Sequence, residues 1–219
     1  KLYAHVIKQD LPEAIGLMAG MFLDSQFPEV EVKHERAVIL EEIAMSEDIP
    51  DDQCYEKFTQ ALLLPHPVGR PVIGTEELVE SYSREELREY WRRVLAPERL
   101  ILSVAGDVDE DEIVRVCEQH FGALRNDAKP QRGMERAPGY SNRKLIDRDL
   151  EQINFCFGTT GPRRRQEERF AWAVYDTILG GGMGSRLFDE VREKRGLAYS
   201  IGSAVAALHE AGYLSISGS

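Results

Sequence analysis

Two glutamates of one predicted helix could act on the same chemical group. Apolar residues between Glu29 and Ser46 recur at helical spacing. On that helix Glu35 and Glu42 lie about 20° apart around the axis, with apolar residues on either side. Both carboxylates are therefore expected on a buried face, where an uncompensated charge is costly. Two compensations are open: an Arg or Lys partner in a buried ion pair, which the residues alone favour, or a metal ion.

The histidines do not strengthen the metal alternative. Zinc sites on a helix typically place two imidazoles at i and i+4, so that both point from one face. No two histidines of this chain have that spacing, so Glu42 is a weak metal signal from the residues alone. The histidines are His5, His34, His66, His120 and His209.

A glycine-rich stretch, "GGGMGS" at residues 180–185, precedes a charged helical pattern. A phosphate-binding loop needs the pattern G-x-x-x-x-G-K-[ST] directly after a buried strand. Here the glycines end a predicted helix, residues 167–180, and no Lys precedes Ser185. The pattern therefore favours a turn between two helices, in which glycine supplies positive φ angles, over a nucleotide site.

Composition and charge exclude several classes of partner. The 219 residues are 42% hydrophobic and 30% charged, and 38 acidic against 27 basic residues give a net charge of −11. Nucleic acid is not expected as a partner, because phosphate contacts need clustered Lys and Arg. No apolar run reaches the ~18 residues of a membrane span, so no membrane partner is expected. The wide spacing of Cys54, Cys117 and Cys156 predicts three inert thiols in a reduced, cytoplasmic protein.

Two blocks of predicted elements indicate an α+β protein. The first block has expected strands at 2–7 and 99–108 and expected helices at 11–27, 29–46, 51–64, 83–95 and 109–121. Ser83 and Glu86 form a capping box for the fourth of these helices. The second block has expected strands within 144–161, 197–208 and 212–218, and helices at 167–180 and 185–195. We expect two domains, residues 1–124 and 145–219, joined by an exposed linker at 125–144.

Four segments together resemble the pitrilysin/insulinase-type zinc peptidases. The branch is the one similar to the mitochondrial processing peptidase and its bacterial relatives. The segments are "HERAVILEEIAMSEDIPDD", "HPVGRPVIGTEE", "ILSVAGDVD" and "GGGMGSRLFDEVREKRGLAYS". The resemblance implies two homologous domains, each an antiparallel-rich sheet packed with helices, with both domains incomplete in this chain.

The resemblance also assigns roles to particular residues. It implies that Glu42 is the third zinc ligand, after two histidines of an inverted His-x-x-Glu-His motif, and that Glu35 supports the site as a second carboxylate. It further implies that Arg192 and Tyr199, seven residues apart after the glycine stretch, contact the substrate carbonyl near the scissile bond. A guanidinium and a phenol are suitable donors for a developing oxyanion. From the residues alone, a solvated Arg and a strand Tyr are favoured.

The chain departs from the family pattern in one respect, because the 219 residues contain no His-x-x-Glu-His motif. We expect a piece of a zinc endopeptidase that acts on extended peptides, is inactive alone, binds zinc weakly or not at all, and belongs to a protein that forms homodimers. A non-catalytic scaffold or complementing subunit of the same family is the alternative, and a nucleotide-binding protein is a third hypothesis.

Overall fold

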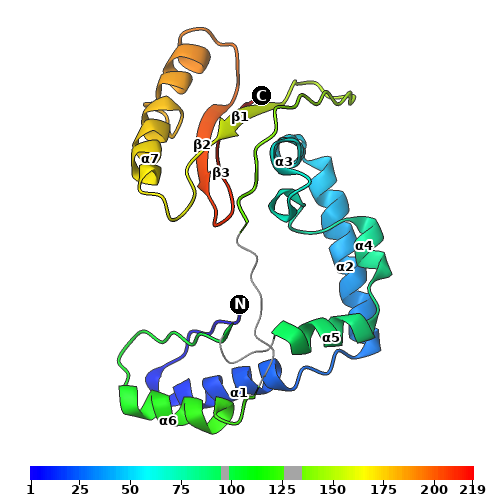
Figure 1. Cartoon of the computed structure of the whole chain (residues 1–219), viewed down its shortest axis with the longest axis vertical. Coiled ribbons are helices and arrows are strands. Elements are labelled where there is room, and N and C mark those ends of the chain that lie inside the picture. Colours follow the sequence, from blue (N-terminus) through cyan, green and yellow to red (C-terminus); the bar gives the residue numbers. More distant parts are fainter. Residues whose placement is uncertain (95–98, 126–134) are drawn as a thin grey trace. The chain divides into compact units, whose positions relative to one another are not determined.

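The computed structural model describes residues 1–94, 99–125 and 135–219, and residues 126–134 of the predicted linker lie outside these ranges. Helices and a three-stranded antiparallel sheet make up the described chain (Figure 1), which confirms the α+β class. Contacts group the chain into two compact units: Lys1–Arg36 with Ser81–Arg132, and Ala37–Glu80 with Gly133–Ser219. The domain division expected at 1–124, 125–144 and 145–219 stays a prediction.

In the first unit, helix α1 (Leu11–Leu23) follows a short 3-10 turn, η1 (Lys8–Asp10), and packs against α6 (Glu110–Phe121). Ile15 and Ala19 are the buried residues of α1. Gly16 allows close approach, because a Cβ there would lie 3.1 Å from Nε2 of His120. Both helices were expected from the apolar spacing, and both are confirmed, although α1 ends four residues earlier than predicted.

The predicted capping box begins α5 (Arg84–Val94). The Ser83 amide donates to Oε2 of Glu86 over 2.8 Å, and the Glu86 amide donates back to Oγ of Ser83 over 3.2 Å. The amide and the hydroxyl of Ser83 both donate to the Glu86 carboxylate, which lowers its pKa. Further along the helix, Trp91 packs edge-on against Phe22 of α1 with ring centroids 4.8 Å apart.

Three predicted strand segments are wrong. Residues 2–7, 99–108 and 144–150 have no strand conformation among the described residues, and Ile101 is 87% exposed. A strand is stabilised by a neighbour that pairs with its backbone groups, and the alternating apolar pattern alone does not supply one. In the described part of the chain, these segments have no such neighbour.

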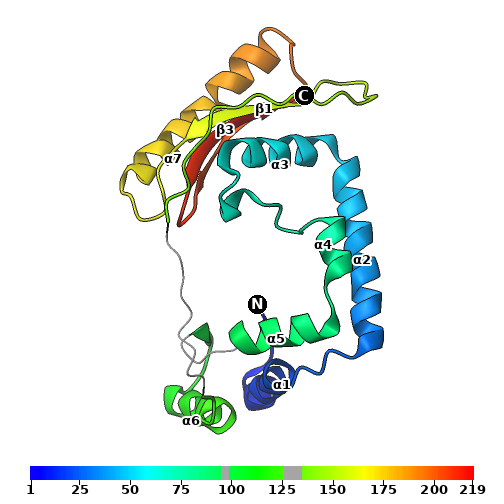
Figure 2. The same cartoon turned by 45° about the vertical axis from the view of Figure 1, so that its right-hand side comes forward.

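In the second unit, strands β1 (Phe155–Thr160), β3 (Gly212–Gly218) and β2 (Ile201–Ala207) form the sheet in that spatial order. Helix α3 (Pro50–Leu63) packs on β1 and α7 (Glu168–Leu179) packs on β2. Gly158, which meets Phe58 of α3, pairs with Ser215, whereas Ser203, which meets α7, pairs with Ile216. Since neighbouring residues of a strand point to opposite faces, α3 and α7 cover opposite faces of the sheet (Figure 2).

The core of this unit lies between α3 and the sheet. It contains Leu62, Leu63, Ala137, Ala211 and Tyr213. Ala137, from the described end of the predicted linker, is buried and its amide donates to the carbonyl of Glu210 over 2.9 Å. The remaining elements are α2 (Glu29–Asp48), the 3-10 turn η2 (Pro67–Gly69), α4 (Glu76–Ser81) and the π-type turn η4 (Phe188–Glu193).

Candidate functional site

Helix α2 carries Glu35 and Glu42 on an exposed face, so the prediction that both carboxylates are buried is wrong. On the same face Val38 is 47% and Met45 66% exposed, and only Ile43, at its flank, is buried. The predicted helix is confirmed, but no other described element covers these apolar residues. Within the described residues neither carboxylate has a hydrogen bond or an ion pair. The alternative of a buried ion pair is therefore also wrong.

The structure brings Arg192 and Tyr199 together, although they belong to different segments. The Arg192 guanidinium lies 4.7 Å from the ring centroid of Phe188 and 5.5 Å from that of Tyr199. Such cation–π contacts orient a cation without neutralising its charge. Tyr199 is 75% exposed, and Arg192 is partly exposed with Glu193 at 3.8 Å. A guanidinium and a phenol are thus presented side by side at the surface.

The backbone between these two residues explains their proximity. The turn η4 ends with the Gly196 amide donating to the carbonyl of Arg192 over 3.0 Å, and Gly196 has φ of +59°. That left-handed conformation suits glycine and reverses the chain after the helix. The Tyr199 amide then donates to the carbonyl of Ser219 over 2.8 Å, which extends the β2–β3 pairing. Tyr199 is therefore held at the end of the sheet.

The glycine stretch is a turn between α7 and the helix that ends in η4, as predicted, but its glycines act differently from the expectation. None of the glycines between 180 and 184 has positive φ. Gly180 is instead required by close approach, because a Cβ there would meet the Ser203 backbone and lie 2.6 Å from its Oγ. Ser203 Oγ in turn donates to Oδ1 of Asp176 over 2.5 Å. This contact fixes the start of the turn against β2.

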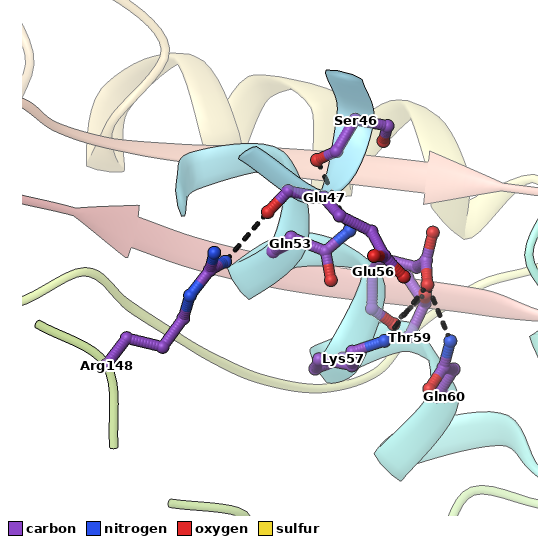
Figure 3. A network of polar contacts seen from close by, with 8 residues as sticks. All are labelled: Ser46, Glu47, Gln53, Glu56, Lys57, Thr59, Gln60 and Arg148. Atoms are coloured by element: carbon purple, nitrogen blue, oxygen red, sulfur yellow. Dashed lines mark hydrogen bonds and ion pairs between the residues drawn. The ribbon is translucent and has the colours of Figure 1, made fainter. Parts of the chain in front are cut away.

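The end of α2 is held by a contact that the sequence pattern did not indicate. Nη1 of Arg148 donates to the carbonyl of Glu47, in the last turn of the helix, over 2.7 Å (Figure 3). A cation at a helix C-terminus is favourable for the macrodipole. The two residues are 101 positions apart, and no local motif connects them.

Beside this contact, α2, α3 and residues 64–76 line a cavity of about 350 Å³. Oε1 of Glu56 accepts from Nε2 of Gln60 over 2.8 Å and lies 3.4 Å from Nζ of Lys57 (Figure 3). The Gln53 side chain donates to the carbonyl of Ser46 over 3.3 Å. Among the charged side chains that line the cavity, Glu56 and Lys57 pair with each other. The lining also includes Glu47, Glu76 and Arg70, so it carries both signs of charge and does not form a site of one charge.

The described residues do not make a zinc site by themselves. No group of three His, Cys, Asp or Glu side chains in the described ranges could hold a metal ion. Zinc sites need three or four protein ligands, and Glu42 would supply only one. Among the described residues, no helix combines the length and apolar character needed to span a membrane.

Comparisons with known proteins give the same family as the sequence motifs. The model for insulinase (peptidase family M16) matches residues 1–76, and that for the peptidase M16 inactive domain matches residues 81–219. An uncharacterized zinc protease of Mycobacterium tuberculosis (strain ATCC 25618 / H37Rv) is 43% identical over 218 residues, which cover 98% of this chain and 50% of the relative. An uncharacterized zinc protease of Bacillus subtilis (strain 168) is 35% identical, with 99% and 52% covered.

A protease from Helicobacter pylori has a similar solved structure. Its TM-score is 0.85 at 19% identity, with 96% of this chain and 52% of that chain covered. At this identity the likeness concerns the fold alone. The chain belongs to the insulinase-type M16 peptidase family and spans about half the length of the curated relatives it matches.

Proposed function

We propose that this chain is part of a zinc-dependent endopeptidase that hydrolyses extended peptides or unfolded protein segments. The observation that carries the proposal is the pairing of Arg192 with Tyr199 at the surface, 5.5 Å from guanidinium to ring centroid. In this proposal both groups donate to the carbonyl oxygen of the scissile peptide bond, where negative charge develops. Donors already in position for that charge are among the largest contributions to enzymatic rate acceleration.

The carboxylates of α2 have the complementary role. Glu42 contributes one zinc ligand in the complete protein, and Glu35, two turns earlier on the same face, supports it. Their exposure and lack of partners among the described residues leave both free for groups outside this chain. Relatives named zinc proteases support a zinc requirement for the complete protein. The 219 residues alone are proposed to be inactive, because a single ligand does not hold the metal.

Arg195 provides a control for the proposed role of Arg192 in catalysis. Arg195 is exposed and lies 3.9 Å from Glu190, three residues after Arg192 on the same segment. In the complete protein, Arg192→Ala should lower kcat/KM on a fluorogenic peptide by ~10²–10³, whereas Arg195→Ala should leave it near the wild-type value. Zinc content should be unchanged in both variants. Equal rates for the two variants would show that Arg192 has no role beyond that of a surface charge.

A non-catalytic scaffold or complementing subunit is the second candidate. The match of residues 81–219 to the model for the peptidase M16 inactive domain favours it. Peptide hydrolysis by the complete protein, abolished by a zinc chelator and restored by added zinc, would exclude this candidate. Hydrolysis that is absent at every zinc concentration would support it.

Partners and location are part of the same proposal. We propose a cytoplasmic homodimer without nucleic-acid or membrane partners. The net charge of −11 supports the exclusion of nucleic acid. Extended peptides suit this family, because a peptide without its own structure can add as a strand to a sheet edge. Light scattering of the complete protein measures its oligomeric state directly.

A further inference from the structure

Helix α3 packs along strand β1, and two contacts between them define the register of the helix on the strand. Phe58 contacts Gly158 so closely that a Cβ on the glycine would lie 2.9 Å from Cζ of the ring. Further along, Leu62 and Thr160 approach the same point, because a Cβ added to Gly139 would meet both side chains. Four residues of helix α3 and two residues of β1 separate these two contacts. The helix and the strand therefore run in the same direction here.

Four residues before Phe58 on α3 and two residues before Gly158 on β1, the same register places two cysteines opposite each other. Four helical residues advance about 6.0 Å and two strand residues about 6.6 Å, so the register between α3 and β1 is kept from one contact to the next. Cys54 precedes Phe58 by four residues, and Cys156 precedes Gly158 by two. Cys54 is thereby placed opposite Cys156 on the face of the sheet that α3 covers.

The surrounding residues agree with this placement. Tyr55, next to Cys54, shares a 2.8 Å hydrogen bond between hydroxyls with Tyr213. Burial, the Tyr55 hydroxyl and the nearby Cys156 thiol all raise the pKa of Tyr213, so this hydroxyl lies near Cys156. Burial raises the pKa of the Cys156 thiol to about 12, and the nearby Cys54 thiol adds to the rise. Both cysteines are half-buried. Cys117 lies on α6, in the other compact unit.

We propose that Cys54 and Cys156 are a disulfide-forming pair whose oxidation links α3 to β1. A low-molecular-weight disulfide is the oxidant. One cysteine thiolate attacks it, which forms a mixed disulfide and releases one small thiol. The other cysteine then attacks the mixed disulfide, which forms the Cys54–Cys156 bond and releases the second small thiol. The two cysteines lose two electrons and two protons, and the small disulfide is reduced.

The proposal revises the expectation of three inert thiols. Thiolate is the attacking species, and below the pKa its fraction rises tenfold with each pH unit. With both pKa values raised, oxidation should be slow near neutral pH and faster at alkaline pH. The bond would close a loop of about 100 residues, a length at which a disulfide strongly restricts the unfolded chain. It would also fix α3, which directly follows α2, to the sheet.

Peptide mapping of the complete protein tests this inference independently of peptidase activity. The folded protein is incubated with oxidised glutathione at about pH 8.5, where thiolate is more abundant. It is then alkylated and digested without reductant. The expected result is a cross-linked peptide pair containing Cys54 and Cys156, lighter by two hydrogens, and a melting temperature that rises and returns after reduction. Cys117→Ser should keep the cross-link, and Cys54→Ser should abolish it.

Two results would overturn the inference. One is that Cys54 and Cys156 both remain open to alkylation, while a urea-unfolded sample reacts with the same oxidant. The other is that glutathione remains attached to either cysteine, because a second thiol within reach would displace it. Cross-linking in the wild-type protein decides the matter even if a serine variant fails to fold.

Discussion

Arg192 lies over the ring of Tyr199 at 5.5 Å, and Gly196 between them reverses the chain. A spacing of seven residues would place two side chains on one face of a continuous helix, but this segment is not one. The contact arises because η4 ends at Glu193 and Tyr199 joins the end of the sheet. Arg192 and Tyr199 therefore depend on a helix end and a strand start for their joint position.

Replacement of the α2 carboxylates in the complete protein should affect zinc without affecting folding, because both are exposed. Glu42→Gln should abolish tight zinc binding, since it removes a charged ligand. Glu35→Gln should weaken zinc affinity by about 10- to 100-fold, the usual effect of losing a supporting carboxylate. Competition with a fluorescent zinc chelator measures both. Glu41→Gln, on a neighbouring face, is the matched control, and an equal loss in that variant would contradict the assignment.

The 219-residue chain alone should not retain zinc. Glu42 is one carboxylate, and no group of three metal-binding side chains lies within the described ranges. One carboxylate does not replace two missing imidazoles. Elemental analysis after gel filtration should therefore give far less than one zinc per chain. Stoichiometric zinc would mean that a ligand set exists that neither the sequence nor the described residues indicate.

In the 180–185 turn, Gly180 lies close to a neighbouring strand and Gly182 lies in open space. Replacement of these two glycines should therefore have different effects on stability. Gly180→Ala should destabilise the fold by about 1–3 kcal/mol, because its Cβ would be forced against Ser203. Gly182→Ala should change stability by less than about 0.5 kcal/mol, since no atom lies within 4 Å of the new Cβ. Urea unfolding followed by circular dichroism compares them. Equal effects would show that close approach is not what requires glycine at position 180.

The helices could be predicted from the sequence because their signals are local. The capping box of Ser83 and Glu86 and the apolar spacing of α2 and α3 each lie within one element. The strand predicted around Ile101 failed, because pairing depends on a partner that no local pattern supplies. Glu35 and Glu42 were placed on the correct helix face, but their burial depended on a covering element that the described chain lacks.

The contacts between distant segments could not be predicted. Arg148 with Glu47, and Cys54 opposite Cys156, join residues about 100 positions apart. No spacing rule connects such pairs, because their distance depends on how segments far apart in the sequence pack together. The roles of Arg192 and Tyr199 came from a family resemblance, and the structure adds only that the two side chains meet.

The most direct test of the proposed function is the kinetics of Tyr199→Phe in the complete protein. This change removes the hydroxyl and keeps the ring on which Arg192 lies. Tyr175→Phe, which removes the hydroxyl of a half-exposed tyrosine on α7, is the control. We predict that Tyr199→Phe lowers kcat/KM on a fluorogenic peptide by ~10²–10³, with zinc content unchanged and Tyr175→Phe at the wild-type rate. A wild-type rate for Tyr199→Phe, or loss of zinc from it, would contradict the proposal that Tyr199 donates to the substrate carbonyl.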